Sequence, residues 1–145
     1  MKLKTLIIDD HPASIAILKN MLDEVCECFV TTRGQKGIEL FEYAYKNGVP
    51  FEVVLLDIIM PGLDGIETLK KIRTIEASYR VSSDPPGKLA RIIMQTSSED
   101  PQDYESSHME GNCSGFINKP YSRGAILDMV LGRGKEVTAD RPHAG

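Results

Sequence analysis

The sequence predicts a three-layer α/β fold in which a parallel sheet lies between two layers of helices. Short continuous apolar runs, of which residues 53–56 are the clearest, have the composition of strands covered on both faces. Amphipathic stretches with apolar residues at helical spacing separate these runs, and five strand–helix units follow one another. This alternation favours a parallel sheet, because each helix carries the chain back to the edge where the next strand begins.

The first two strand–helix units occupy residues 3–48. Pro12 suits the first turn of a helix, where a missing amide N–H costs nothing. Asn47-Gly48 ends the second helix, because glycine readily adopts the left-handed conformation found after helices. The expected elements are a strand at 3–9, a helix from Pro12 with apolar spacing up to Val25, a weaker strand at 26–32 and a helix at 34–46.

The other three units follow the same plan. Asp64 is suited to cap the third helix, and a breaker-rich loop at 82–87 precedes the fourth strand. Gly124 and Gly132 lead us to expect frayed ends for the last helix. The expected elements are strands at 51–57, 90–95 and 114–118, and helices after Asp64, at 101–110 (a weak pattern) and at 122–131.

Composition and length bound the organisation of the chain. The 145 residues fit one domain, which we place at residues 1–132. The polar segment 133–145 is expected to be a loosely ordered tail, either the start of a linker or the end of the chain. A net charge of −4 argues against a broad face for binding nucleic acid.

The sequence also predicts a cytoplasmic protein. No apolar run approaches the roughly 20 residues that span a bilayer, and Asp9-Asp10 interrupts the first apolar stretch before a signal peptide could form. Cys26 and Cys28 form C-x-C rather than the C-x-x-C of zinc or redox sites, and Cys113 is isolated. We interpret all three as buried or half-buried thiols in a reducing compartment.

Charged and hydroxyl side chains follow four of the predicted strands at their carboxyl ends. These residues are Asp9-Asp10, Asp57, Thr96-Ser97 and Lys119. Ligands of open α/β sheets bind at this edge. Three clustered carboxylates repel one another, and Mg²⁺, which prefers oxygen ligands, would relieve that repulsion. Lys119 adds a positive charge for phosphate oxygens. Because no Ser–His or Cys–His pair is evident, an Asp nucleophile that forms an acyl phosphate is the covalent route left open.

Four motifs at these strand ends resemble the receiver domain of two-component response regulators. They are residues 6–10 (LIIDD), 54–65 (VLLDIIMPGLDG), 92–97 (IIMQTS) and 115–121 (GFINKPY). The resemblance runs from Leu3 to about Leu131, nearly the whole chain, and it rests on all four motifs occurring in order. It implies a flavodoxin-like three-layer sandwich with strand order 2-1-3-4-5 and five helices, and a cis bond between Lys119 and Pro120.

The resemblance also assigns roles to the matching residues. Asp57 would accept the phosphoryl group, and Lys119 would bind its oxygens. Mg²⁺ or Mn²⁺ would be held by Asp10 and Asp57, by Asp9 through water, and by the backbone carbonyl of Ile59. Thr96 would be the switch hydroxyl and Phe116 the aromatic side chain that turns inward with it. Ser97 would leave room for the phosphoryl group.

The function implied is that of a phosphorylation-activated switch rather than an enzyme, since only its own phosphorylation and dephosphorylation are catalysed. The donor would be a histidine kinase or a histidine phosphotransfer protein. The signal would pass to a downstream protein or a missing output domain, or to a dimer, through the face formed by residues 101–110, 114–118 and 122–131. Neither nucleic acid nor membrane is an expected direct partner.

Other readings remain open from the residues alone. A dehalogenase-type aspartate phosphatase would need a second Asp two residues after the nucleophile, where this chain has Ile59. A flavodoxin-like FMN binder would need a phosphate loop where this chain has Asp9-Asp10. A phosphorylation-independent interaction module would need a broken site.

Two positions beside the site are predicted to set the lifetime of the phosphorylated state. They are Ile59, two residues after Asp57, and Ser98, two residues after Thr96. Residues 78–88, between the third helix and the fourth strand, form a longer connection than minimal receivers have.

Overall fold

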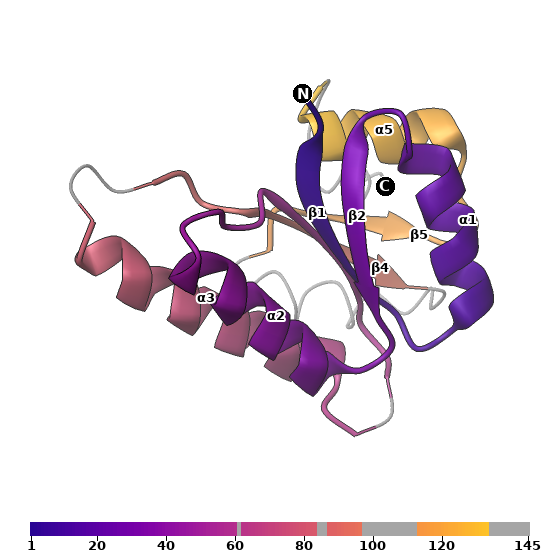
Figure 1. The fold of residues 1–145 in the computed structure, drawn as a ribbon. Helices are drawn as coiled ribbons and strands as arrows, with labels where there is room; N and C mark the ends of the chain where they lie inside the picture. Colours follow the sequence, from indigo (N-terminus) through magenta and orange to yellow (C-terminus); the bar gives the residue numbers. More distant parts are fainter. Residues whose placement is uncertain (61, 84–86, 97–112, 134–145) are drawn as a thin grey trace, which may run out of the picture.

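Five parallel strands form one sheet in the order β2-β1-β3-β4-β5, as predicted (Figure 1). The computed structural model describes residues 1–60, 62–83, 87–96 and 113–133. The strands are β1 (Leu3–Ile8), β2 (Cys26–Thr31), β3 (Val53–Asp57), β4 (Arg91–Thr96) and β5 (Gly115–Asn118). Each strand lies within two residues of its predicted position. The apolar runs of β1, β3 and β4 are largely buried on both faces, whereas β2 is partly exposed.

Helices cover both faces of the sheet, α1 and α5 on one side and α2 and α3 on the other (Figure 1). Their bounds are α1 (Pro12–Leu22), α2 (Gly34–Lys46), α3 (Gly65–Val81) and α5 (Arg123–Leu131). The helix predicted at 101–110 and the tail at 133–145, apart from Arg133, lie outside the described residues. The three-layer α/β sandwich is confirmed.

Two apolar cores, one on each face of the sheet, hold the layers together. Alternate residues of one strand enter different cores, so that Ile7 of β1 packs with α1 and α5 while Leu6 and Ile8 pack with α2 and α3. This alternation is the pleat of a strand buried on both sides. Cys26 is buried, Cys28 and Cys113 are half-buried, and all three are free thiols, as expected.

Helix ends follow local capping chemistry. Pro12 lies in the first turn of α1, and the Asp64 carboxylate accepts a hydrogen bond from the Glu67 amide at 2.9 Å, as predicted. α1 ends at Leu22, earlier than the apolar spacing to Val25 suggested. The expectation of frayed ends for α5 is wrong, because Ser122 caps its first turn and Gly132, with a φ of 71°, closes its last turn in the left-handed conformation.

The third helix is longer than predicted. The sequence predicts a connection at residues 78–88, but Ser78–Val81 form the last turn of α3. Tyr79 in this turn stacks on Tyr45 of α2, with ring centroids 5.1 Å apart. Glu76, which is 1% exposed, binds both the Arg73 guanidinium at 2.8 Å and the Ala90 amide at 2.6 Å. These contacts extend the helix along α2 and tie it to the start of β4, and local propensity does not reveal them.

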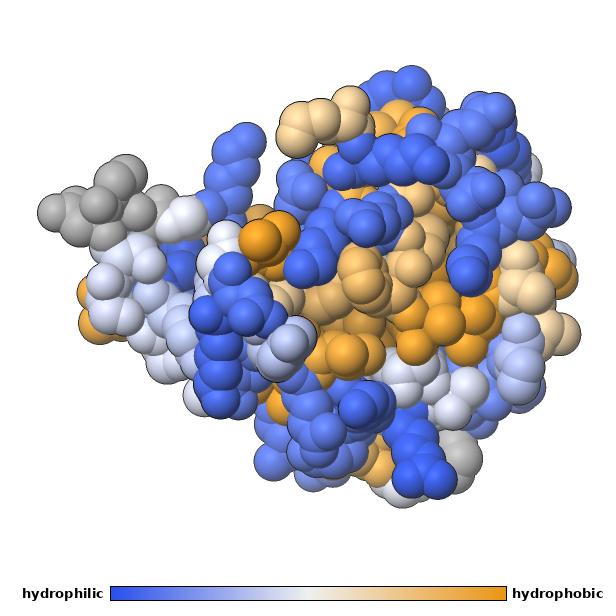
Figure 2. Space-filling view, viewed as in Figure 1, coloured by the Kyte–Doolittle hydropathy of each residue, from blue (hydrophilic) through white to orange (hydrophobic). Residues whose placement is uncertain are grey.

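The edge strand β2 is the least covered part of the sheet. Phe29 and Val30 are 37% and 39% exposed, and Figure 2 shows apolar residues gathered on the face that carries this strand. The other sheet edge, β5, lies far from it in the strand order. Among the described helices, none has the length and apolarity required to cross a bilayer.

Candidate functional site

Three carboxylates and one histidine meet at the carboxyl edge of the sheet. Asp57 is the last residue of β3, and Asp9, Asp10 and His11 form the turn between β1 and α1. Ligand atoms of these four residues lie within 4.8 Å of one another. The parallel arrangement of β1 and β3 brings the two strand ends together, as the sequence predicted. The sequence predicts a structural or exposed His11, and its side chain is indeed 65% exposed, at the rim of the cluster.

Lys119 brings a positive charge to this cluster from the end of β5. Its Nζ lies 2.9 Å from Asp9 Oδ2 and 3.4 Å from Asp57 Oδ2. The backbone places it there: the Lys119 amide donates to the Thr96 carbonyl at 2.8 Å, and the bond to Pro120 is cis, as predicted. Burial lowers the pKa of Lys119, but its hydrogen bonds and the charges of Asp9 and Asp57 outweigh burial, so the net pKa is raised and the amine stays charged.

Asp57 is a buried carboxyl whose ionisation the fold resists. Its side chain is only 6% exposed. Burial raises its pKa to about 6, the nearby charge of Asp9 acts in the same direction, and Lys119 and the backbone amide of Ile59 oppose the rise. The charge of Lys119 and the Ile59 amide therefore favour the ionised form of Asp57 against the effect of burial. Additional positive charge in the cluster would lower the pKa further.

Asp9 and Asp10 have different environments although they are adjacent. Both oxygens of the fully buried Asp9 are engaged, Oδ1 by the His11 amide at 2.9 Å and Oδ2 by Lys119. Asp10 Oδ1 is buried and accepts no hydrogen bond; His11 Nδ1 lies 3.1 Å away, but not in hydrogen-bonding geometry. A buried carboxylate oxygen without a donor is costly. A divalent cation bound there would remove that cost, so the residues present fit an oxygen-liganded cation.

The loop after β3 fixes the position of Asp57. The Ile58 amide donates to the Gln95 carbonyl, and the Gly65 amide donates back to the Ile58 carbonyl, both at 2.9 Å. A Cβ on Gly65 would meet the Asp57 carbonyl oxygen and would lie 2.6 Å from Ile58 Cα. Glycine is therefore required where α3 begins against the end of β3. Ile59 extends from this loop with 59% of its surface exposed.

The remaining predicted residues are distributed around this cluster. Thr96 is the last residue of β4 and is 1% exposed. Phe116 of β5 is 3% exposed and packs in the core on the α2 and α3 side. Its side chain therefore already lies inward in this structure. Ser97 and Ser98 fall outside the described residues, as does the helix predicted to complete the output face.

Sequence reasoning missed a polar pair beside the cluster. The Tyr121 hydroxyl donates to Gln95 Oε1 at 2.6 Å, and Gln95 is fully buried. The only available signal was a glutamine in the otherwise apolar run that forms β4. Tyr121 belongs to the motif at residues 115–121, which assigns no role to it.

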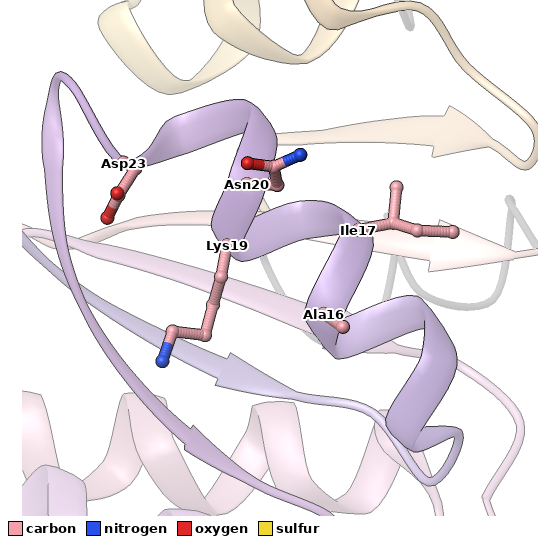
Figure 3. A pocket seen from close by; sticks show the side chains of 5 residues that line it. All are labelled: Ala16, Ile17, Lys19, Asn20 and Asp23. Atoms are coloured by element: carbon pink, nitrogen blue, oxygen red, sulfur yellow. The ribbon is translucent and has the colours of Figure 1, made fainter.

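A second surface feature lies away from this cluster. Figure 3 shows the side chains of α1 and of Asp23 that line a surface pocket, and none of them is a predicted site residue. The pocket is lined by Ala16, Ile17, Lys19, Asn20 and Asp23. Ile17 is 56% exposed there. The pocket is therefore separate from the acidic cluster.

An open parallel sheet with clustered side chains at its carboxyl edge places the protein in the class of α/β folds that bind ligands at that edge. Comparison with known proteins narrows this class. Residues 5–131 match the family model described as the response regulator receiver domain. The chain belongs to that family, which confirms the resemblance seen in its sequence.

Individual relatives range from small proteins to parts of large ones. The chain is 28% identical over 130 residues to the chemotaxis protein CheY of Halobacterium salinarum, covering 90% of this chain and 95% of that protein. It is also 28% identical over 131 residues to the sensor protein GacS of Pseudomonas syringae pv. syringae, where the match covers 88% of this chain but 13% of the relative. The family thus occurs both as nearly whole proteins and as small parts of large ones.

Solved structures share the fold. A CheX–CheY–BeF3–Mg complex from Borrelia burgdorferi contains a chain 26% identical to this one, with a TM-score of 0.72 and coverage of 90% of this chain and 87% of that chain. CheY4 of Vibrio cholerae aligns with a TM-score of 0.73 at 22% identity, covering 91% of this chain and 98% of that one.

Proposed function

We propose that this chain is a phosphorylation-activated switch that accepts a phosphoryl group on Asp57. The observation that carries the proposal is the buried Asp57 carboxylate, which lies with Asp9, Asp10 and His11 within 4.8 Å and has the Lys119 amine 3.4 Å from its Oδ2. A buried acid whose pKa is shifted by burial and by neighbouring charges is typical of a functional site, where its charge or that of an attached group takes part in the function. The match to the response regulator receiver domain, and relatives that are a chemotaxis protein and a sensor protein, support the same function.

The chemistry follows from the positions of these side chains. Asp57 supplies a carboxylate oxygen that attacks the phosphorus of a phosphohistidine in line. A new O–P bond forms, the N–P bond breaks, and the imidazole nitrogen leaves with the bonding electrons. Lys119 exchanges its contact with Asp57 for the incoming phosphoryl oxygens, whose charge it offsets. Positioning and charge neutralisation therefore carry the reaction.

The acidic cluster would hold Mg²⁺ or Mn²⁺. Asp10, whose Oδ1 has no hydrogen-bond donor, and Asp57 are the direct carboxylate ligands we propose, with the Ile59 carbonyl as a third. Asp9 already has both oxygens engaged and acts through water. When bound, the cation neutralises charge on the phosphoryl oxygens. The Mg²⁺- and BeF3-containing relatives from Borrelia and Arabidopsis support this assignment.

The switch itself is a shift between two packings of the face that includes β5 and α5. Phosphorylation adds a dianion that attracts Thr96 and Lys119 toward Asp57. Because Phe116 is already buried here, we propose that phosphorylation stabilises its inward position instead of creating it. The face then binds a downstream protein, an output domain or a second copy of the chain. Donors are a histidine kinase or a histidine phosphotransfer protein, and we place the reaction in the cytoplasm.

Labelling tests this function directly. The purified chain is incubated with acetyl phosphate or a phosphorylated histidine kinase in Mg²⁺, beside Asp57→Asn and the same mixture with EDTA. We expect phosphoryl incorporation in the wild type alone. Equal labelling of Asp57→Asn would reject the site, and a wild type that neither labels nor binds beryllofluoride would favour a phosphorylation-independent interaction module. Steady hydrolysis of added phosphate esters would favour a dehalogenase-type phosphatase, although Ile59 occupies the position of its second Asp.

A further inference from the structure

Gln95 is a polar residue on an otherwise apolar face of the sheet. It is in register with Asp57 on the neighbouring strand β3 and with Ile117 on β5. Strand alternation places it on the α1 and α5 side, where Ile93, two residues earlier, and Ile117 belong to the apolar core. Its side chain is fully buried. A methionine or leucine would fill such a position without a polar group to satisfy.

Tyr121 holds one end of the Gln95 amide. The phenol hydroxyl donates to Gln95 Oε1 at 2.6 Å from the segment that follows Lys119 and Pro120. Burial raises the pKa of Tyr121, and the charges of Asp9 and Asp57 raise it further, so the ring lies within the field of the acidic cluster. The hydrogen bond therefore joins the strand of Thr96 to the segment that positions Lys119.

The other end of the amide is a donor without an acceptor. Gln95 Nε2 is buried and has no hydrogen-bond partner in the part of the chain that the structure describes. A buried, unpaired donor destabilises a folded protein. A buried donor without an acceptor needs an explanation, and one explanation is a ligand that accepts its hydrogen bond. Asp57 is the residue in register with Gln95 on the neighbouring strand β3, so the site at the end of β3 is the place where we look for such a ligand.

We infer that Gln95 is an accessory ligand for the phosphoryl group on Asp57, with its Nε2 donating to a phosphoryl oxygen and Tyr121 acting as the positioning residue that keeps the amide oriented. The inference rests on the proposed function and deepens it. A hydrogen bond to a charged group is stronger than one between neutral groups, so the donor is unused before phosphorylation and used after it. Gln95 would thus destabilise the unphosphorylated chain and strengthen the binding of a tetrahedral anion.

Gln95→Met tests the inference because it separates stability from binding. The probe is beryllofluoride in saturating Mg²⁺, with affinity measured by calorimetry and thermal unfolding measured without ligand. We expect the variant to bind beryllofluoride at least about tenfold more weakly. Its melting temperature should equal or exceed that of the wild type, and its Mg²⁺ affinity without beryllofluoride should stay within about twofold. Thr5→Val, which removes another fully buried polar side chain near the start of β1, is the matched control and should bind like the wild type.

Tyr121→Phe completes a double-mutant cycle. Loss of the hydroxyl should weaken beryllofluoride binding by about threefold, and the double variant should bind no worse than Gln95→Met alone, since Tyr121 acts through the amide. Additive losses would overturn the positioning role. Unchanged binding in Gln95→Met, or weaker binding together with lower melting temperature and weaker Mg²⁺ binding, would overturn the inference about Gln95. In those cases wild-type binding still supports the proposed function, whereas a wild type that fails to bind beryllofluoride overturns both.

Discussion

At the scale of single residues, Asp57 combines two conflicting requirements. The proposed phosphorylation needs an ionised carboxylate, but burial raises the pKa of Asp57 to about 6. Lys119 relieves part of this conflict by approaching Asp57 Oδ2 to 3.4 Å. Without a cation, ionising Asp57 still destabilises the folded chain relative to the unfolded one. In the unfolded chain the same carboxyl ionises at its ordinary pKa of 3.8.

This cost predicts how Asp57→Asn changes stability with pH in EDTA. Because the pKa of Asp57 is raised in the folded chain, the protonated carboxyl stabilises the fold relative to the unfolded chain. This stabilisation is complete below about pH 4 and is lost as pH rises to about 6. The uncharged variant avoids this loss. It should match the wild type in unfolding free energy near pH 4 and exceed it by up to about 3 kcal/mol at pH 7. Urea unfolding at both pH values measures the difference. Asp128→Asn, an exposed change of equal charge, should show no such crossover.

Ile59 is predicted to prolong the phosphorylated state. Its side chain is apolar, stands two residues after Asp57 and cannot orient an attacking water, so we expect self-dephosphorylation on a scale of many minutes or longer. Ile59→Asn supplies a polar group there and should accelerate decay by at least about tenfold. The measurement is loss of label after donor removal. Val49→Asn, an equally exposed apolar position (57% against 59% exposed), is the control, and an unchanged rate in Ile59→Asn would contradict the explanation.

At the scale of elements, the turn from β3 into α3 sets the geometry of the site. β3 ends at Asp57 and α3 begins at Gly65, whose amide donates to the Ile58 carbonyl at 2.9 Å. The Asp64 side chain caps the helix at the same point. Helix α3 and strand β3 are thus joined by backbone contacts, so we expect a change at the start of α3 to reach Asp57.

Gly65→Ala tests this connection. The added methyl group would meet the backbone of Asp57 and Ile58, neither of which can move aside cheaply. We expect a loss of about 2 kcal/mol in unfolding free energy, together with weaker beryllofluoride binding. Chemical unfolding and calorimetry measure both. Gly87→Ala, where a Cβ meets nothing within 4 Å, is the control and should keep wild-type values. Wild-type binding by a stable Gly65→Ala variant would show that the close approach does not matter.

At the scale of the whole molecule, the site is shared by strands that are distant in the chain. Lys119 and Asp9 are 110 residues apart in sequence, yet their side chains are 2.9 Å apart. A ligand that binds this arrangement binds only the folded chain. Folding and cation binding are therefore linked, and the link is measurable as stability.

Mg²⁺ should stabilise the wild type through this linkage. At a concentration about 100 times the dissociation constant, the gain is about 2.7 kcal/mol, which corresponds to several degrees in melting temperature. Asp10→Asn should lose most of this gain, because it removes the carboxylate that lacks a hydrogen-bond donor. Thermal unfolding with and without Mg²⁺ measures it, with Asp128→Asn as the control for charge. An equal gain in Asp10→Asn would place the cation elsewhere.

Much of this architecture could be predicted from local patterns. Buried strands such as β3 are recognisable in the sequence as apolar runs, and caps such as Asp64 form hydrogen bonds to residues only three positions away. The last turn of α3 could not be predicted, since Tyr79 and Glu76 are held by α2 and by the start of β4. The closed end of α5 was missed because Gly132, read as a source of fraying, takes the left-handed conformation that ends a helix.

The sequence by itself determined the strand-end positions of Asp9, Asp10, Asp57, Thr96 and Lys119, because side chains that follow apolar runs must gather at one edge of a parallel sheet. Only the tertiary structure decided which hydrogen-bond partners the side chains of the site have. It engages both oxygens of Asp9, leaves Asp10 Oδ1 without a donor and joins Tyr121 to Gln95. The physical reason is that burial and hydrogen bonding depend on which strands become neighbours, and no single segment contains that information.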